Sequence, residues 1–230
     1  MEKLHFFGAS LLTFSIPFTA VSLLILENIP LTALGIGIII LAASILLTPT
    51  RSVPPQAVRA MLESSILSLE EILEEFEIAR RGYYIRAPDG RVYLYVPLRE
   101  DIGPPSRKEE PAGLVYRESG VEYLVLVPPA AELVKSPEVS GIGFEPALTY
   151  VLIDLLEAAD SLEVVTDGFI TVKLRNVKSH VSAGRFKTVF GSLEASIAAC
   201  IAANLLGPTR VAEEFEEGDD RIIILEVLGR

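Results

Sequence analysis

The chain has 230 residues, half of them hydrophobic, a formal net charge of −11 at pH 7 and a single cysteine. This acidic balance argues against nucleic acid as a partner, and one cysteine excludes an internal disulfide and is typical of a reducing compartment. The two histidines and one cysteine are also too few for a zinc site built from these ligands.

Two apolar stretches, at 4–26 and 31–47, occupy most of the first fifty residues, and neither contains Asp, Glu, Lys or Arg. As helices they would measure about 34 and 26 Å, against about 30 Å for the hydrocarbon core of a bilayer. The first stretch is too long for the apolar region of a signal peptide. Because the four residues 27–30 can only form a tight turn, we expect an antiparallel transmembrane hairpin.

Small residues four positions apart suggest how the two helices pack. Ala9 and Thr13 on the first helix, and Ala33 and Gly37 on the second, would let the backbones approach closely. Pro17 removes one backbone hydrogen bond in the middle of the first helix, a defect that membrane helices tolerate.

Basic residues near the ends of the hairpin predict its orientation. Lys3 precedes the first helix, Arg51 and Arg59 follow the second, and the turn carries only Glu27. The positive-inside rule therefore predicts a multi-pass protein of the cell membrane with both termini in the cytoplasm. The whole chain contains only four Asn and Gln residues, a scarcity that hints at a thermophile.

The next element is an amphipathic helix over 57–80, after a proline-rich linker. Arg80 and Arg81 suit a helix C-terminus, and Gly82 is its expected stop. Its apolar stripe consists of Leu62, Ile66, Leu69, Leu73 and Phe76. The heptad-like run is shorter than a coiled coil needs. Docking on its own domain is therefore favoured, and pairing with a second copy stays open.

The remaining chain predicts an α+β fold, with helices packed on a mainly antiparallel sheet. The predicted hairpins join 83–85 to 92–96, 114–116 to 121–127, 162–166 to 169–174, and 211–215 to 222–227, each across turn residues. Helices are predicted at 144–159 and 193–206, the second capped by Ser192. The segment 102–113, with charges at 108–110, is predicted to be a surface loop, and 130–143 to be irregular.

A basic segment, residues 178–187, stands out in this acidic domain. It contains Lys178, Arg185, Lys187 and His180 among small residues. Such a segment could bind an anion or an acidic partner. A solvated loop is the commoner explanation, because no glycine-rich phosphate-binding motif accompanies it.

No residue is assigned a catalytic, cofactor-binding or metal-binding role. Cys200 lies among apolar residues and is expected to be a buried, inert thiol. The glutamate pairs 213–214 and 216–217 are expected on an acidic surface without function. The GxGxxG and GxSxG motifs are absent, and residues 141–143 are too little for a nucleotide-binding loop.

Two resemblances add to this interpretation. The arrangement of two apolar helices, the segment GRVYLYVPL and the ending FKTVFGSLEASIAACIAANLLGPTRVAEEFEEGDDRIIILEV resembles an uncharacterised archaeal family of small membrane-anchored proteins. The last forty residues, with Gly191, Gly207 and Gly218, are also similar to vinyl reductase domains. That similarity implies a domain that binds a small ligand or a partner. The cysteines that many of those domains carry are absent here, where Phe215 and Ile222 stand.

The sequence thus predicts three parts: a transmembrane hairpin (1–50), a juxtamembrane linker and helix (51–81) and a cytosolic α+β domain (82–230). We expect a membrane-anchored scaffold or adaptor that recruits a cytosolic protein, without a cofactor. A small-ligand sensor is the alternative, and an enzyme acting on a membrane-associated substrate is the third class. An apolar closed pocket would favour the sensor, and convergent polar groups in an open cleft the enzyme.

Overall fold

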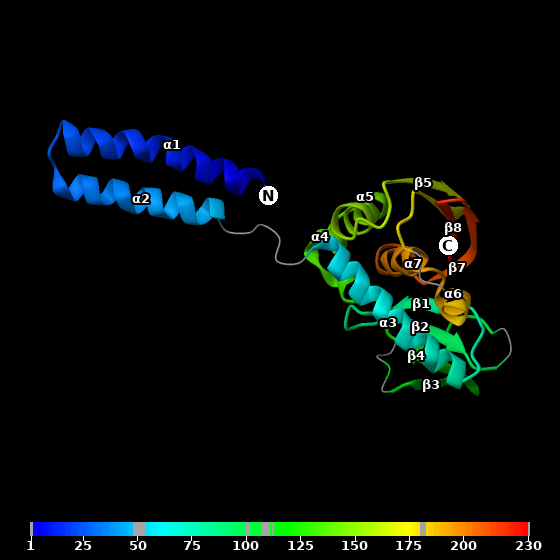
Figure 1. Ribbon diagram of the computed structural model, residues 1–230. Coiled ribbons are helices and arrows are strands. Elements are labelled where there is room, and N and C mark those ends of the chain that lie inside the picture. Colours follow the sequence, from blue (N-terminus) through cyan, green and yellow to red (C-terminus); the bar gives the residue numbers. More distant parts are fainter. Residues whose placement is uncertain are drawn as a thin grey trace. The chain divides into compact units, whose positions relative to one another are not determined.

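The computed structural model describes residues 2–47, 54–99, 102–106, 111, 113–179 and 183–229. The charged cluster at 108–110 and residues 180–182 of the basic segment lie outside the described residues. The chain divides into two compact units, Met1–Pro54 and Pro55–Arg230 (Figure 1). Each unit has its own core.

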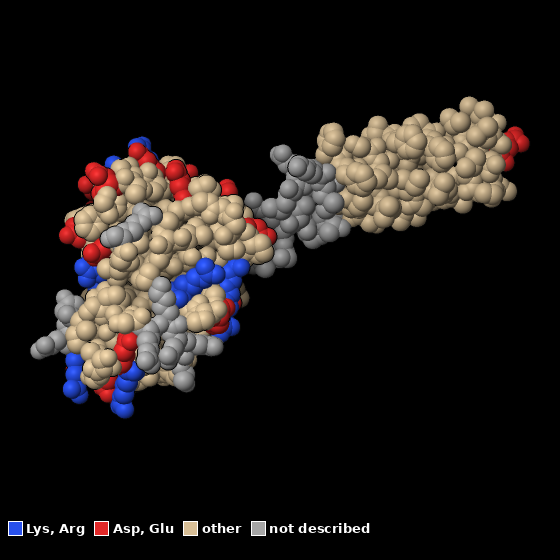
Figure 2. Space-filling view, turned by 180° about the vertical axis from the view of Figure 1, so that it is seen from behind, with Lys and Arg blue, Asp and Glu red and all other residues tan. Residues whose placement is uncertain are grey.

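The first unit is a hairpin of two helices, α1 (Glu2–Leu24) and α2 (Ile29–Leu47). The turn lies at 25–28 rather than 27–30, because Asn28 begins the second helix by accepting a hydrogen bond from the Leu31 amide with its side-chain oxygen. The described surface of the hairpin is uncharged along its length, with acidic atoms only at the turn (Figure 2). Both helices are long and apolar enough to span a membrane.

The prediction of which small residues join the two helices was wrong. Ala9, Thr13, Ala33 and Gly37 are all exposed on the outside of the hairpin. The residues buried between the helices are Gly8, Ser15 and Ser22, seven apart on α1, and Thr32, Gly35 and Ala42 on α2. A Cβ atom on Gly35 would lie 2.2 Å from Thr19 Oγ1. Glycine is therefore required for this close approach.

The second unit is built on one eight-stranded antiparallel sheet with the order β3-β4-β2-β1-β7-β8-β6-β5. Its strands are β1 (Tyr83–Arg86), β2 (Val92–Pro97), β3 (Val115–Glu118), β4 (Val121–Leu126), β5 (Ser161–Asp167), β6 (Phe169–Arg175), β7 (Thr209–Glu217) and β8 (Asp220–Val227). The four predicted hairpins are confirmed. Strands β1 to β4 form an N-terminal half and β5 to β8 a C-terminal half, joined where Tyr84 of β1 pairs with Thr209 of β7.

Helices cover one face of this sheet, which we call the inner face, so the predicted α+β class is confirmed. They are α3 (Pro55–Glu75), the 3₁₀ turn η1 (Leu133–Lys135), α4 (Pro137–Ser140), α5 (Phe144–Leu148), the π-helix η2 (Thr149–Leu155), α6 (Gly184–Phe190) and α7 (Leu193–Leu205). The alanine-rich α7 contacts strands of both halves and is almost wholly buried. Ser192 caps it, as predicted, by accepting a hydrogen bond from the Ala195 amide at 3.2 Å.

Three segments differ from their predicted structure. The segment 130–143 contains η1 and α4, and α6 occupies the end of the basic segment. The helix predicted at 144–159 changes from α to π at Thr149 and ends at Leu155. Helical periodicity alone does not distinguish these two hydrogen-bonding patterns.

The amphipathic helix α3 ends five residues earlier than predicted. Glu77 adopts a left-handed conformation, with a φ of 51°, and the Ile78 amide donates to the Leu73 carbonyl. These contacts close the helix at Glu75. Gly82 has another role, because its amide donates to the Val189 carbonyl and a Cβ atom there would lie 2.6 Å from Leu94.

The apolar stripe of α3 docks on its own unit, as predicted. Ile66 and Leu73 are buried in the main core, and Leu62 and Leu69 pack against it. Phe76 is the exception, with 60% of its surface exposed.

Two polar contacts fix the two ends of α3. Near its N-terminus, Arg59 Nη1 donates to the Glu157 carbonyl at 3.0 Å. Further along, the Glu70 carboxylate accepts hydrogen bonds from the Arg185 and Phe186 amides in the first turn of α6, at 2.9 and 2.5 Å. An acidic side chain in this position offsets the partial positive charge of the helix start.

Candidate functional site

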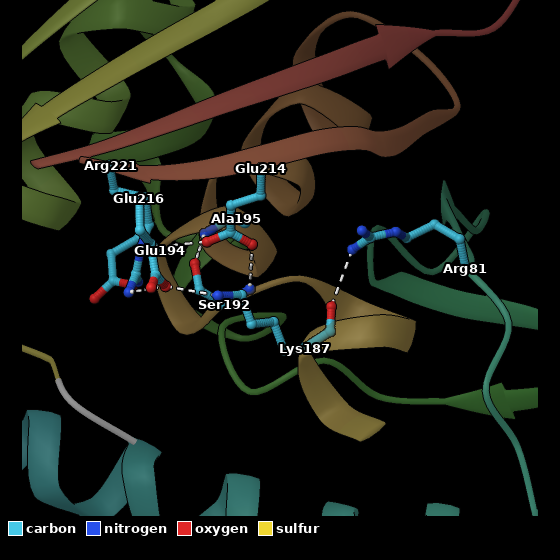
Figure 3. A network of polar contacts seen from close by, with 8 residues as sticks. All are labelled: Arg81, Lys187, Ser192, Glu194, Ala195, Glu214, Glu216 and Arg221. Atoms are coloured by element: carbon cyan, nitrogen blue, oxygen red, sulfur yellow. Dashed lines mark hydrogen bonds and ion pairs between the residues drawn. The ribbon is translucent and has the colours of Figure 1, made fainter. Parts of the chain in front are cut away.

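A polar cluster lies where the β7–β8 hairpin meets α6 and α7 (Figure 3). Its members are Lys187, Glu194, Glu214, Glu216 and Arg221. The pairing of Glu216 with Arg221 and of Glu214 with Ile223 turns both glutamates and the arginine toward the inner face. Lys187 comes from α6, and Glu194 from the first turn of α7.

Arg221 is the centre of the cluster. Its guanidinium pairs with Glu194 through Nη1, lies 3.1 Å from Glu216 Oε1 through Nη2, and lies 3.3 Å from Glu214 Oε1 through Nε. Lys187 Nζ lies 2.6 Å from the same Glu216 oxygen. Arg221 thereby joins the hairpin to α7, and Glu216 joins it to α6.

Burial sets the electrostatics of the cluster. Glu194 is fully buried, and desolvation raises its pKa, against the opposing effect of Arg221. Glu216 is largely exposed, and its hydrogen bond from Lys187 lowers its pKa. Within the described residues, Glu194 Oε1, Glu214 Oε1 and Arg221 Nε have no hydrogen-bond partner. Such buried ionic groups stabilise a fold only while each charge keeps its partners.

A cavity of about 300 Å³ borders this cluster. Lys187, Glu216 and Arg221 line it, together with Ser179 and with Ile66 of α3. Its volume is at the lower end of the range for small-molecule sites. Because charged and hydroxyl side chains make up much of its wall, the cavity suits a small polar ligand better than an apolar one.

The structure corrects the interpretation of the glutamate pairs. Only 2% of the Glu214 side chain is exposed, and its Oε2 accepts a hydrogen bond from the Ser192 amide at 3.0 Å. Glu216 is bound by two cations rather than solvated alone. The predicted burial of Cys200 is confirmed, and this burial raises the pKa of its thiol.

Acidic groups of the same chain engage the described part of the basic segment. Lys178 Nζ lies 2.9 Å from Asp160 Oδ1, Lys187 binds Glu216, and the Arg185 amide binds Glu70. Two of the cations considered for an external anion, Lys178 and Lys187, are thus paired with carboxylates of the same chain. Sequence reasoning missed Glu194 and Arg221, although a glutamate opening an alanine helix and an arginine preceding three isoleucines were available signals.

A second candidate site is the outer face of the C-terminal half of the sheet, the face without helices. The strand registers place Phe215 beside Ile222 and Val165 beside Thr171. Phe215 and Phe169 are 48% and 50% exposed, and Val165 is also exposed. The charged residues on this face are Glu163, Asp167, Lys173, Arg175, Arg210, Glu213, Glu217, Asp220 and Glu226.

A hollow of about 310 Å³ interrupts this outer face near the β-bulge between Val211 and Glu213. Phe169, Arg210 and Glu226 line it. Arg210 and Glu226 pair across the strands at 2.5 Å. The face therefore combines exposed apolar side chains, a depression and a charged rim, as protein-binding surfaces do.

Comparison with curated proteins gave no match, and comparison with solved structures gave none. One family model matches residues 14–224, a range that begins within α1 and ends within β8. The match therefore includes most of the apolar hairpin and nearly all of the sheet. The chain belongs to the family described as Domain of unknown function (DUF7982).

Proposed function

We propose that the protein is a membrane-anchored adaptor that recruits a cytosolic protein to the outer face of its C-terminal half-sheet. The observation that carries this proposal is the exposure of Phe169, Phe215 and Val165 on a face that the described chain leaves uncovered. Exposed apolar residues gathered on one surface mark interaction sites more often than scattered ones do. The apolar hairpin supplies the anchor.

The charges on this face define the chemistry of the partner. Six carboxylates outnumber three cations on this face. The carboxylates belong to Glu163, Asp167, Glu213, Glu217, Asp220 and Glu226, and the cations to Lys173, Arg175 and Arg210. A complementary surface has an apolar stripe flanked by Lys or Arg. The partner is therefore a basic amphipathic segment. A helix of this kind would lie on the opposite face of the sheet from α7.

Site-specific photocross-linking tests the adaptor proposal. A photoreactive amino acid at Thr171, in the middle of the face, is expected to capture a protein in intact membranes. The captured protein, purified, should then bind the full-length chain at least about tenfold more weakly after Phe169→Ser plus Phe215→Ser. Leu114→Ser, at an exposed apolar position elsewhere, is the matched control and should keep full affinity. Equal affinity for all three chains would refute the proposal.

The cavity beside Arg221 supports a second candidate, a sensor of a small polar ligand. Its polar lining favours this function over a site for an apolar molecule. Thermal-shift measurements with the full-length protein and a panel of small polar metabolites test it. A ligand whose stabilisation is lost in Ser179→Val, but not in Leu114→Ser, would support the sensor.

The orientation of the chain in the membrane is part of the proposal, because the second unit must face the cytosol to meet a cytosolic partner. It rests on Lys3, Arg51 and Arg59. Single cysteines at Asn28 and Ser106, in a Cys200→Ala chain, can be treated with an impermeant thiol reagent on whole cells. Labelling at 28 but not at 106 is the expected result, and the reverse pattern would refute the orientation.

A further inference from the structure

The helix α3 has a second apolar stripe that its docking leaves uncovered. Met61, Ile72 and Phe76 are 73%, 40% and 60% exposed. Ser65 and Ser68 lie between them. The spacings of four, three and four residues place Met61, Ser65, Ser68 and Ile72 along one side of the helix. Phe76 follows the last helical residue, and its amide still donates to the Ile72 carbonyl at 3.1 Å, which continues the stripe. This stripe is distinct from the buried one that contains Ile66 and Leu73.

Charge is distributed unevenly along α3. Its second half carries Glu70, Glu71, Glu74 and Glu75. The first half carries one carboxylate, Glu63, whose charge is partly offset by Arg59 at 4.0 Å. Two parallel copies would place the acidic halves side by side, which is unfavourable. Two antiparallel copies would place each acidic half beside a half with little charge.

We propose that α3 pairs antiparallel with α3 of a second copy of this chain, across the stripe of Met61, Ser65, Ser68, Ile72 and Phe76. In such a pair, Met61 lies opposite Ile72 and Ser65 lies opposite Ser68. The same register places Phe76 opposite Ala57, which is small and exposed. Because each contact occurs twice about a two-fold axis, the surface is self-complementary.

A second copy of this chain is the partner that both the charge distribution of α3 and its attachment to the apolar hairpin favour. The stripe provides only a few large side chains. The area that it can bury is therefore small beside the roughly 1,200 Å² that a specific interface between free proteins buries. The chain begins with two helices apolar enough to span a membrane, and α3 follows them after seven residues. Confinement to one membrane raises the effective concentration of α3 helices and offsets the small contact area.

Disulfide cross-linking of full-length chains in native membranes tests this pairing. Two differently tagged copies are co-expressed, one with Met61→Cys and the other with Ile72→Cys, and treated with a mild oxidant. Cys200 can remain, since it is fully buried. A disulfide between the two tagged copies is expected. Met61→Cys expressed alone should not cross-link, because identical positions would be offset by about 16 Å along an antiparallel pair.

Controls separate pairing from random collision. Leu67→Cys is exposed on another side of α3 and should cross-link with neither Met61→Cys nor Ile72→Cys. Cross-linking of Met61→Cys with itself would overturn the antiparallel arrangement, and the absence of a Met61–Ile72 disulfide would overturn the pairing. The test does not involve the outer face of the sheet, so its failure leaves the adaptor proposal unaffected.

Discussion

The outer faces of the two halves of the sheet differ in burial. In the N-terminal half, Tyr83, Tyr93, Tyr95 and Tyr123 form a buried cluster with Ile85, Ala87 and Val125. The hydroxyl of Tyr123 donates to the Gly103 carbonyl at 2.8 Å, so the segment after β2 contributes to this cover. In the C-terminal half, the corresponding face exposes Phe169 and Phe215. Among the described residues, one half is covered by its own chain and the other is left uncovered.

The inner faces differ as well. Tyr84 of the N-terminal half is fully buried, and its hydroxyl donates to the Phe190 carbonyl at 2.7 Å and lies 3.0 Å from Ser196 Oγ. The C-terminal half instead buries the ion pair of Arg221 and Glu194. Neutral hydroxyl groups cost less to bury than charges do. The comparison teaches that the C-terminal half uses ionic contacts to hold the helices while its other face exposes apolar side chains.

The largest expected effect comes from removing the central cation. Arg221→Met leaves Glu194 and Glu214 buried without their positive partner and should destabilise the second unit by about 3–5 kcal/mol. Near-UV circular dichroism measures this during thermal unfolding, because all tyrosines lie in the second unit. Arg210→Met, which breaks the more exposed pair with Glu226, should cost less than about 1 kcal/mol. Equal losses would contradict the structural role of the cluster.

The second prediction concerns the closed outer face. Tyr95 is almost fully buried and packs edge-on against Tyr116 and Tyr123, with ring centroids 5.7 and 6.4 Å apart. Tyr95→Ala should therefore cost about 3 kcal/mol through lost burial and the cavity left behind. Chemical denaturation of the full-length protein in detergent would show this as a lower midpoint.

The third prediction concerns a contact within the helical layer, between Glu70 of α3 and the first turn of α6. Glu70→Gln keeps the shape of the side chain but removes its charge and one of its acceptors for the α6 amides. A loss of about 1–2 kcal/mol is expected. Glu71→Gln, at the neighbouring exposed position, is the control and should change the unfolding temperature little. A similar change in both variants would show that the helix start does not require the Glu70 carboxylate.

Ionisation of buried tyrosines at alkaline pH should act on the N-terminal half, since strands β5 to β8 contain no tyrosine. Burial raises the pKa of Tyr95 to about 12, whereas an unfolded tyrosine ionises near pH 10. The stability contributed by the neutral phenol is therefore complete below pH 10 and lost as the pH rises toward 12. Tyr95→Phe should make stability decline less steeply with rising pH. The change is expected to be smaller than the stability lost in Tyr95→Ala. An identical decline in the variant would assign it to other groups.

Local patterns in the sequence predicted most of the sheet. Turn residues such as Asp167 and Gly168 identified the hairpins, and the spacing of Ile66 and Leu73 identified the buried side of α3. The order of the strands was not predictable in this way, because the joint between Tyr84 and Thr209 brings together residues far apart in the chain. Neither residue has a local signal for the other.

The polar cluster was unpredictable for the same reason. Glu214 and Glu216 look like solvated residues of an acidic strand until the hairpin register places Arg221 beside them. Glu70 looks like one of several surface glutamates until α6 is placed next to α3. An isolated pattern cannot distinguish a charge that faces water from one that meets a distant partner.

The smallest expected effect tests the open face directly. Phe215→Ala removes an aromatic ring that is about half exposed. Because much of this ring already contacts water in the folded protein, its removal takes away little buried apolar area. The free energy of unfolding should therefore fall by less than about 1 kcal/mol. Tyr95→Ala, an equivalent truncation on the closed face, provides the matched comparison, and the same denaturation experiment measures both. A loss near 3 kcal/mol for Phe215→Ala would mean that another part of the chain covers this face, and that the two halves do not differ. A small loss would leave Phe215 without a major role in stability, as expected of a residue whose role is to contact a partner.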